Sequence, residues 1–152
     1  MGDFPETDDP MSVAFAEARA AARLGEVPVG AAIMRDGRLL ASAGNRTRTL
    51  SDPTAHAETL AIRIACAAIA DERLAGADLY VTLEPCVLCV GAISFARIRR
   101  LYFAASDAKG GAVENGVRFF GQPTCHHAPE VYGGIREQEA AVLLKDFFGE
   151  RR

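Results

Sequence analysis

The hydrophobic pattern near the start of the chain predicts a helix. Four apolar residues recur there at spacings of 4, 3 and 4, which places their side chains on one helical face: Met11, Phe15, Ala18 and Ala22. Asp9 and Pro10 precede them, as a capping residue followed by a proline at the first helical position. We therefore expect a helix that begins at Pro10 and ends near Gly25.

Short apolar runs predict the strands of a sheet. They cover residues 27–34, 39–43, 79–83 and 100–104, and a short edge strand is expected near Val131. Asp36 and Gly37 separate the first two runs and are typical of a hairpin turn, so these strands should be antiparallel neighbours. The third and fourth runs flank a helix predicted over residues 86–97, which implies parallel strands joined by a right-handed crossover.

Two further helices complete the pattern. Residues 55–70 are apolar almost all round, as in a helix buried against a sheet. Residues 136–148 form the last helix, and Phe147 lies on its apolar stripe and is expected in the core. The elements together predict an α/β fold, a mixed sheet with helices on its faces. We expect residues 10–152 to form one domain behind a disordered acidic leader of residues 1–9.

Composition narrows the class of protein. The chain has 152 residues, of which 49% are hydrophobic and 24% charged, enough for one core without a disulfide or metal to hold it together. The net charge is −3, but four acidic residues lie among the first ten, so the remainder is close to neutral with a small positive excess in its second half. This balance argues against a general polyanion-binding protein and is compatible with one local basic patch.

The sequence also indicates a compartment. No apolar run reaches the ~18 to 20 residues of a membrane-spanning helix, and acidic residues stand where a signal peptide is first basic and then apolar. We therefore expect a cytoplasmic protein without membrane contact. In that compartment its four cysteines are expected as thiols or metal ligands: Cys66, Cys86, Cys89 and Cys125.

Two segments carry residues suited to metal chemistry. Residues 54–58 read Thr-Ala-His-Ala-Glu and residues 84–89 read Glu-Pro-Cys-Val-Leu-Cys, each at a predicted helix start. Cys86 and Cys89 are three residues apart, so their sulfurs lie on one side of a helix, whose N-terminus favours the thiolate form. With His56 they make a ligand set typical of Zn²⁺.

His56 and Glu58 set a geometric condition. Residues two apart in a helix point in nearly opposite directions, so these side chains converge only on a point beyond the helix end. We expect the site where the two helix N-termini meet, at the carboxyl edge of the strands that precede them. Three protein ligands leave the fourth zinc position to water. Glu58 is then the expected catalytic base, which takes a proton from that water and passes it to a substrate nitrogen.

Each motif alone has simpler interpretations. A Cys-x-x-Cys pair also occurs in redox proteins, and a single histidine at a helix start is most often a cap or a core residue. A structural zinc or redox module without catalysis predicts a fourth protein ligand, for which Cys125 and His126 are candidates. We expect a structural role for Cys125, His126 and His127. The conjunction of His-x-Glu with Pro-Cys-x-x-Cys, each at a helix start, resembles the known signature of the zinc deaminases.

Further segments resemble the bacterial tRNA-specific adenosine deaminases, over roughly residues 11–152. They are residues 26–31, 44–46, 52–58, 79–86, 96–99 and 107–110. The resemblance implies a cytidine-deaminase-like three-layer α/β/α fold with a central mixed five-stranded sheet, a homodimer, and one Zn²⁺ per subunit held by His56, Cys86 and Cys89. It also implies hydrolytic attack on C6 of a flipped adenine at the wobble position of a tRNA anticodon stem-loop, which gives inosine.

The same resemblance implies substrate contacts. Asn45 is expected to hydrogen-bond the nucleotide, with Ala57 and Glu84 beside the base. A flipped base also suits apolar walls, for which Val29 and Leu83 are the candidates. The RNA contacts expected farther out are Asp107, Lys109, Phe148 and Arg152.

The substrate has an alternative. A deaminase of a free nucleobase or nucleoside, such as guanine, cytosine or adenosine, uses the same zinc chemistry. The aromatic and basic residues at 145–152 argue against it, because a small substrate does not need them. Another basic cluster consists of Arg97, Arg99 and Arg100. It fits a solvent-exposed face and a dimer contact equally well.

Overall fold

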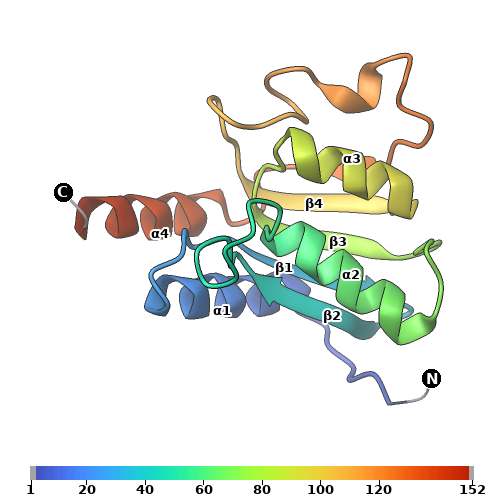
Figure 1. The fold of residues 1–152 in the computed structure, drawn as a ribbon, viewed down its shortest axis with the longest axis horizontal. Coiled ribbons are helices and arrows are strands. Elements are labelled where there is room, and N and C mark those ends of the chain that lie inside the picture. The colour runs from blue at the N-terminus through green and yellow to red at the C-terminus, as the bar shows by residue number, and fades with distance from the viewer. Residues whose placement is uncertain (1–2, 151–152) are drawn as a thin grey trace.

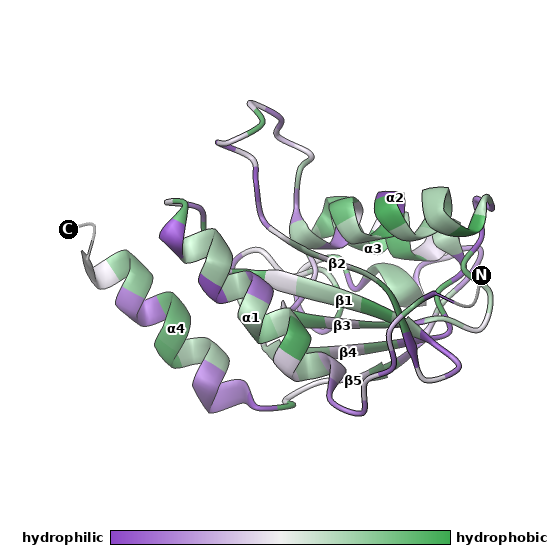
Figure 2. Cartoon of the chain, turned by 90° about the horizontal axis from the view of Figure 1, so that it is seen from below, coloured by the Kyte–Doolittle hydropathy of each residue, from purple (hydrophilic) through white to green (hydrophobic). Residues whose placement is uncertain are grey.

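The structure, a computed structural model, describes residues 3–150. A mixed sheet forms the middle layer. The helices α1 (Pro10–Arg23) and α4 (Glu137–Glu150) lie on one face, and α2 (Ala57–Ile69) and α3 (Val87–Ala96) lie on the other (Figure 2). The predicted three-layer α/β/α architecture is therefore confirmed.

The sheet has five strands in the order β2-β1-β3-β4-β5 (Figure 1). Their bounds are β1 Gly30–Arg35, β2 Arg38–Gly44, β3 Asp78–Leu83, β4 Arg100–Ala105 and β5 Glu130–Tyr132. β1 pairs antiparallel with β2 and β3, whereas β4 pairs parallel with β3 and β5. Because β1 alone is reversed, β2, β3 and β4 all end at the same edge of the sheet.

Local signals in the sequence have their expected structural effects. Asp36 and Gly37 both have positive φ, 52° and 75°, as the tight turn between β1 and β2 requires. The Asp9 carboxylate caps α1 by accepting hydrogen bonds from the backbone N–H of Ser12 at 3.2 Å and from its hydroxyl at 2.7 Å. The parallel pairing of β3 with β4 across α3 agrees with the prediction.

The first strand is shorter than its apolar run. β1 begins at Gly30 rather than at residue 27. Pro28 has no N–H to offer a neighbouring strand, and the N–H of Val29 bonds the carbonyl of Val27 at 2.8 Å instead. Val27 and Val29 therefore stand at the end of the sheet, outside the strand.

Residues 3–9 differ from the disordered leader expected there. The Leu39 N–H donates to the carbonyl of Pro5 at 2.8 Å, and Arg38 pairs with Glu6 at 3.0 Å. Phe4 packs against the core. The physical reason lies in the β1–β2 hairpin, whose outer side offers backbone groups without a strand partner.

Apolar side chains fill the space on both faces of the sheet. One buried cluster, which includes Ile33, Leu79 and Phe103, lies mainly between the sheet and α2 and α3. A second, which includes Phe15 and Ala140, lies on the side of α1 and α4. Within residues 3–150, no helix is both long and apolar enough to cross a bilayer.

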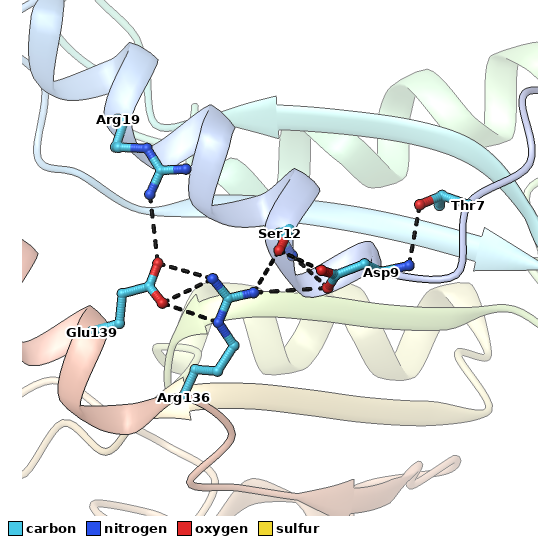
Figure 3. Close-up of polar contacts among 6 residues, drawn as sticks. All are labelled: Thr7, Asp9, Ser12, Arg19, Arg136 and Glu139. Atoms are coloured by element: carbon cyan, nitrogen blue, oxygen red, sulfur yellow. Dashed lines mark hydrogen bonds and ion pairs between the residues drawn. The ribbon is translucent and has the colours of Figure 1, made fainter.

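Arg136 joins α4 to α1 (Figure 3). Its guanidinium donates to the Ser12 hydroxyl at 2.6 Å and to the Glu139 carboxylate at 2.8 Å, and it lies 4.7 Å from the centroid of the Phe15 ring. Arg19 of α1 reaches the same Glu139 carboxylate at 3.5 Å (Figure 3). Single exposed ion pairs stabilise little, but this network fixes the direction in which α4 leaves the sheet.

Helix α1 packs directly on β1 at Gly30. A Cβ at Gly30 would overlap the carbonyl oxygen of Ala14 and lie 2.6 Å from the backbone nitrogen of Ala18. The missing side chain therefore lets the two backbones touch.

Gly30→Ala should destabilise the protein by roughly 1–3 kcal/mol, because the added methyl group pushes α1 away from β1. The measurement is the free energy of unfolding in urea, followed by circular dichroism. Gly91→Ala in α3 is the matched control, since nothing lies within 4 Å of a Cβ there. It should leave the stability unchanged or raise it by up to ~1 kcal/mol. Equal effects of the two substitutions would contradict the close packing at Gly30.

Candidate active site

Residues at the shared edge of the sheet surround a cavity of about 340 Å³. The lining comes from the segments before β1 and after β2 and β4, from the end of β3, and from the starts of α2 and α3. The lining residues are Val27, Val29, Asn45, Thr47, His56, Ala57, Glu58, Leu83, Glu84, Cys86, Asp107 and Gly110. The volume lies at the lower end of the range of small-molecule sites, which suits a single nucleobase.

Most of the residues predicted for the site line this cavity, and the exceptions are Cys89, Lys109, Phe148 and Arg152. Cys89 is fully buried, and Lys109 is exposed on the turn after β4. Phe148 lies on α4 with 48% of its surface exposed. Arg152 lies outside the residues that the structure describes, so its role stays a prediction.

Three residues that line the cavity are not among the predicted site residues: Val27, Thr47 and Gly110. Val27 and Gly110 belong to segments that carried the family resemblance, and that was their only signal. Thr47 lies in a loop without periodicity, so only the folded chain shows where it stands.

The three predicted metal ligands meet where α2 and α3 begin. His56 and Cys86 occupy the N-cap positions of the two helices, both with extended backbone, and Cys89 lies in the first turn of α3. The Nδ1 atom of His56 lies 3.4 Å from the Cys86 sulfur and 3.4 Å from the Cys89 sulfur. Two positions within a helix would point His56 and Glu58 in nearly opposite directions. His56 lies just outside the helix, so its side chain can point toward the same site as Glu58.

This donor set fits Zn²⁺. Tetrahedral bonds of about 2.1 Å to nitrogen and 2.3 Å to sulfur place these ligand atoms about 3.6 Å apart, close to the observed 3.4 Å. A hydrogen bond with Cys89 lowers the pKa of Cys86 to about 5, helped by backbone N–H groups, so this sulfur is readily available as thiolate. No further His, Cys, Asp or Glu side chain among residues 3–150 joins the group. Three ligands are the number expected of a catalytic zinc site.

Glu58 lies in the first turn of α2 beside this group. It lines the cavity, and only 4% of its surface is exposed. Burial raises the pKa of Glu58 to about 7. A carboxyl group with such a pKa can accept and release a proton near neutral pH, as the predicted proton carrier must.

A fully buried carboxylate holds the loop between β2 and α2. Burial by itself raises the pKa of Glu26, but hydrogen bonds from Thr49 and Arg48 hold it below its usual range. Thr49 donates both its N–H and its hydroxyl to Glu26, each at 2.6 Å. This loop carries Asn45 and Thr47 into the cavity wall. No hydrogen bond within residues 3–150 uses the side-chain amide of Asn45, which leaves that amide available to a substrate.

A second buried carboxylate, that of Glu84, holds the segment after β4. Only 2% of the Glu84 surface is exposed, and it accepts hydrogen bonds from the backbone N–H of Asp107 at 3.0 Å and of Glu114 at 2.9 Å, among others. Asp107 and Gly110 lie in this segment and line the cavity. Each of the two loops that form walls of the cavity is thus held by hydrogen bonds to a buried carboxylate.

Two arginines of the cluster at residues 97–100 pair with carboxylates of the sheet. Arg99 makes two hydrogen bonds to Asp78, at 3.0 and 2.8 Å, and Arg100 contacts Glu130 at 3.3 Å. These ion pairs join β3 to β4 and β4 to β5. The two arginines are therefore occupied, rather than free to bind phosphate.

Cys125 lies apart from the metal ligands. Its sulfur donates to the carbonyl of His127 at 3.2 Å, and the Nε2 of His127 donates to the carbonyl of Ile98 at 2.7 Å. Cys125 does not reach the ligand group among the residues described. The structure thus offers no support for Cys125 as a fourth protein ligand.

Comparisons with known proteins agree with this geometry. Residues 6–105 match the cytidine and deoxycytidylate deaminase zinc-binding region. The chain is 63% identical over 142 residues to the tRNA-specific adenosine deaminase of Agrobacterium fabrum, covering 93% of both chains. It is 41% identical over 142 residues to that of Bacillus subtilis, covering 93% of this chain and 88% of the relative.

The chain belongs to the cytidine and deoxycytidylate deaminase family and is a hydrolytic deaminase. Within that family, it belongs to the tRNA-specific adenosine deaminases.

Solved structures show the same fold. One, from biochemical and structural work on A-to-I editing by tRNA:A34 deaminases at the wobble position of transfer RNA, has a TM-score of 0.89 and 62% identity, covering 91% of this chain and all of that one. A guanine deaminase from Bacillus subtilis has a TM-score of 0.63 and 28% identity, covering 97% of this chain and 94% of that one. The fold is thus shared by deaminases that act on different bases.

Cys89→Ala should abolish zinc binding, because two protein ligands do not hold a stable tetrahedral site. Zinc per chain, measured by mass spectrometry of the purified and dialysed protein, tests this. Cys125→Ala is the matched control and should retain the wild-type zinc content, since Cys125 lies outside the ligand group. Loss of zinc in the control would restore the interpretation in which Cys125 is a fourth ligand.

Proposed function

We propose that this protein hydrolyses adenosine to inosine at the wobble position of a tRNA anticodon stem-loop. The observation that carries the proposal is a cavity of nucleobase size in which the buried carboxyl group of Glu58 stands beside a three-ligand zinc set. The 63% identity to a tRNA-specific adenosine deaminase supports tRNA as the substrate.

His56, Cys86 and Cys89 would hold one Zn²⁺ per subunit. Bound zinc supplies Lewis-acid activation of the water that hydrolyses the C6–N bond. Glu58 accepts a proton from this water and returns it to a nitrogen of the substrate, so that one carboxylate serves both steps. Water adds at C6, ammonia leaves, and a carbonyl oxygen remains at C6 of the inosine. The balance is one water consumed for each ammonia released.

The cavity walls suit a flipped purine. Val29 and Leu83 supply apolar contacts for the face of the base, Ala57 and Glu84 line the cavity beside it, and the amide of Asn45 is free to bind the nucleotide. A cavity of this size accepts a base only after the base has left its stack. An unpaired anticodon loop presents such a base at low cost.

RNA contacts outside the cavity would come from the turn after β4 and from α4. Asp107 and the exposed Lys109 lie on this turn, beside the cavity. Phe148 is half exposed on α4, whereas Phe147 is buried, as the helical pattern predicts. Figure 1 shows α4 projecting from the side of the sheet on which α2 and α3 begin. An exposed aromatic ring there suits stacking on an unpaired base.

We infer a homodimer formed through α3. This helix exposes Val87 and Phe95, with 66% and 82% of their surfaces accessible, and Leu88 is partly exposed between them. A groove between α2 and α3 is lined by Leu88, Phe95 and Ile62, among others. Large apolar side chains gathered on one face are typical of a protein interface. We place the enzyme in the cytoplasm, together with its tRNA.

Incubation of the purified protein with an anticodon stem-loop that carries adenosine at the wobble position should produce inosine. The products are separated by nuclease digestion and chromatography. A stem-loop with guanosine at that position is the control substrate. Absence of inosine at high enzyme concentration would refute the proposal, and ammonia release from free guanine, cytosine or adenosine at a comparable rate would favour the free-base alternative.

Glu58→Gln should lower the rate of inosine formation by roughly 10²- to 10⁴-fold, because the amide does not carry the proton. Its zinc content should equal that of the wild type, since Glu58 is not one of the three ligands. Glu72→Gln, an exposed position in the loop after α2, is the control and should keep full activity. Undiminished activity of Glu58→Gln would exclude the proton-transfer role.

Phe95→Glu should convert the dimer into a monomer, because it places a charge in the centre of the proposed apolar interface. Light scattering coupled to size-exclusion chromatography gives the mass of each variant. Phe148→Glu, which changes an exposed phenylalanine on α4 in the same way, should remain dimeric. A dimer that persists in Phe95→Glu would place the interface elsewhere.

A further inference from the structure

Six hydrogen bonds end on the carboxylate of Glu84. Oε1 accepts from the Ser106 hydroxyl at 3.2 Å, the Asp107 N–H at 3.0 Å and the Asn115 side-chain amide at 2.7 Å. Oε2 accepts the backbone N–H groups of Val113 at 3.1 Å, Glu114 at 2.9 Å and Asn115 at 3.0 Å. No Lys or Arg of residues 3–150 forms an ion pair with Glu84.

These donors occupy all the hydrogen-bond acceptor sites of the Glu84 carboxylate. An ionised carboxylate has about four lone-pair sites, fewer than the six donors already directed at it. Glu84 lines the cavity but has no acceptor capacity left for a base. Its side chain therefore acts on the protein, and all six donors belong to one segment, residues 106–115.

This segment is the wall of the cavity beyond β4. Asp107 and Gly110 lie within it and line the cavity. One further bond joins it to the residues that precede Cys86, from the Ala112 N–H to the carbonyl of Pro85 at 2.9 Å. The Glu84 N–H also bonds the carbonyl of Ala105, the residue directly before the segment, at 2.8 Å. The segment is thus fixed relative to the ligand-bearing start of α3.

The backbone of the segment packs directly against the Glu84 carboxylate at Gly111. A Cβ at Gly111 would overlap the Glu84 carboxylate and lie 2.6 Å from the carbonyl oxygen of Asp107. Close approach of this backbone to the carboxylate therefore depends on the missing side chain at Gly111. The contact can be broken from either side by substitution.

We propose that Glu84 is a positioning residue whose carboxylate holds residues 106–115 in the conformation that forms the Asp107–Gly110 wall of the catalytic cavity. Its effect on turnover rests on the proposed function, since the wall orients the target base. Its effect on the segment does not depend on any substrate.

Glu84→Gln tests the role of the carboxylate at constant size. One oxygen becomes an NH₂ group, which accepts nothing, so at least two N–H donors face another donor in either orientation of the amide. Buried donors without an acceptor are costly, so the segment should open more often. Gly111→Ala should have the same local effect, by displacing the segment.

Amide hydrogen exchange reports directly how often residues 106–115 open. In zinc-loaded Glu84→Gln, the amides of Val113, Glu114 and Asn115 should exchange roughly 10- to 100-fold faster than in the wild type. Amides of β1 and β3 should exchange at wild-type rates, and the zinc content should be unchanged. Glu114→Gln is the matched control, because it removes a carboxylate from the same segment while its own side chain makes none of the six bonds. It should behave as wild type.

The kinetics of inosine formation in the stem-loop measure the effect of the two substitutions on catalysis. Glu84→Gln and Gly111→Ala should lower kcat by roughly 10- to 100-fold with KM changed less than about threefold, because a misplaced wall impairs the orientation of the base more than the binding of the loop. An increase in KM at unchanged kcat would show that Glu84 binds substrate directly, and would overturn the positioning role.

Two other results would also overturn it. Wild-type exchange at residues 113–115 in Glu84→Gln would show that the carboxylate does not hold the segment. Faster exchange throughout the sheet would show that Glu84 only stabilises the whole fold. If the wild-type enzyme makes no inosine, the proposed function fails, whereas the exchange experiment still decides whether Glu84 holds the segment.

Discussion

The active site depends on the parallel pairing of β3 with β4. Strands that run in the same direction require a connection that crosses back over the sheet, and α3 makes that crossing. α3 therefore begins at the edge where β3 ends, and brings Cys86 and Cys89 there. β2 ends at the same edge because β1, which lies between β2 and β3, is reversed. The chain that follows β2 leads into α2, with His56 and Glu58 at its start. The 3.4 Å separations among the ligands follow from this topology.

Two buried carboxylates turn the loops at this edge into walls. Glu26 accepts backbone N–H groups from the loop after β2, and Glu84 accepts them from the segment after β4. Neither forms an ion pair within residues 3–150. A buried carboxylate without donors is as costly as buried N–H groups without an acceptor, so each carboxylate and its loop stabilise one another. The cavity therefore has fixed walls on both sides of the ligand group, although both walls consist of loops.

The sequence predicts the parts of this arrangement that depend on local periodicity and short spacing. The helices, the Asp36–Gly37 turn and the His56, Cys86 and Cys89 ligands all have signals within a few residues of themselves. The donors to Glu84 do not, because they lie 22 to 31 residues away from it. Nothing near Thr47 or Val27 indicates a cavity. The contacts of residues 3–9 likewise depend on an exposed hairpin edge that exists only after folding.

The zinc ligands and Glu58 leave the choice of substrate open. A guanine deaminase with a TM-score of 0.63 and 28% identity shares this fold, so selection of the base and of RNA depends on residues around and beyond the cavity. α4 projects beyond the edge of the sheet (Figure 1). Consecutive residues of a helix point about 100° apart, so burying Phe147 exposes Phe148. The contacts of Arg136 with Ser12 and Phe15 fix the direction of α4, and with it the position of the exposed ring. Under the proposed function, α4 extends the RNA-binding surface beyond the cavity, whereas hydrolysis of the C–N bond takes place at the edge of the sheet.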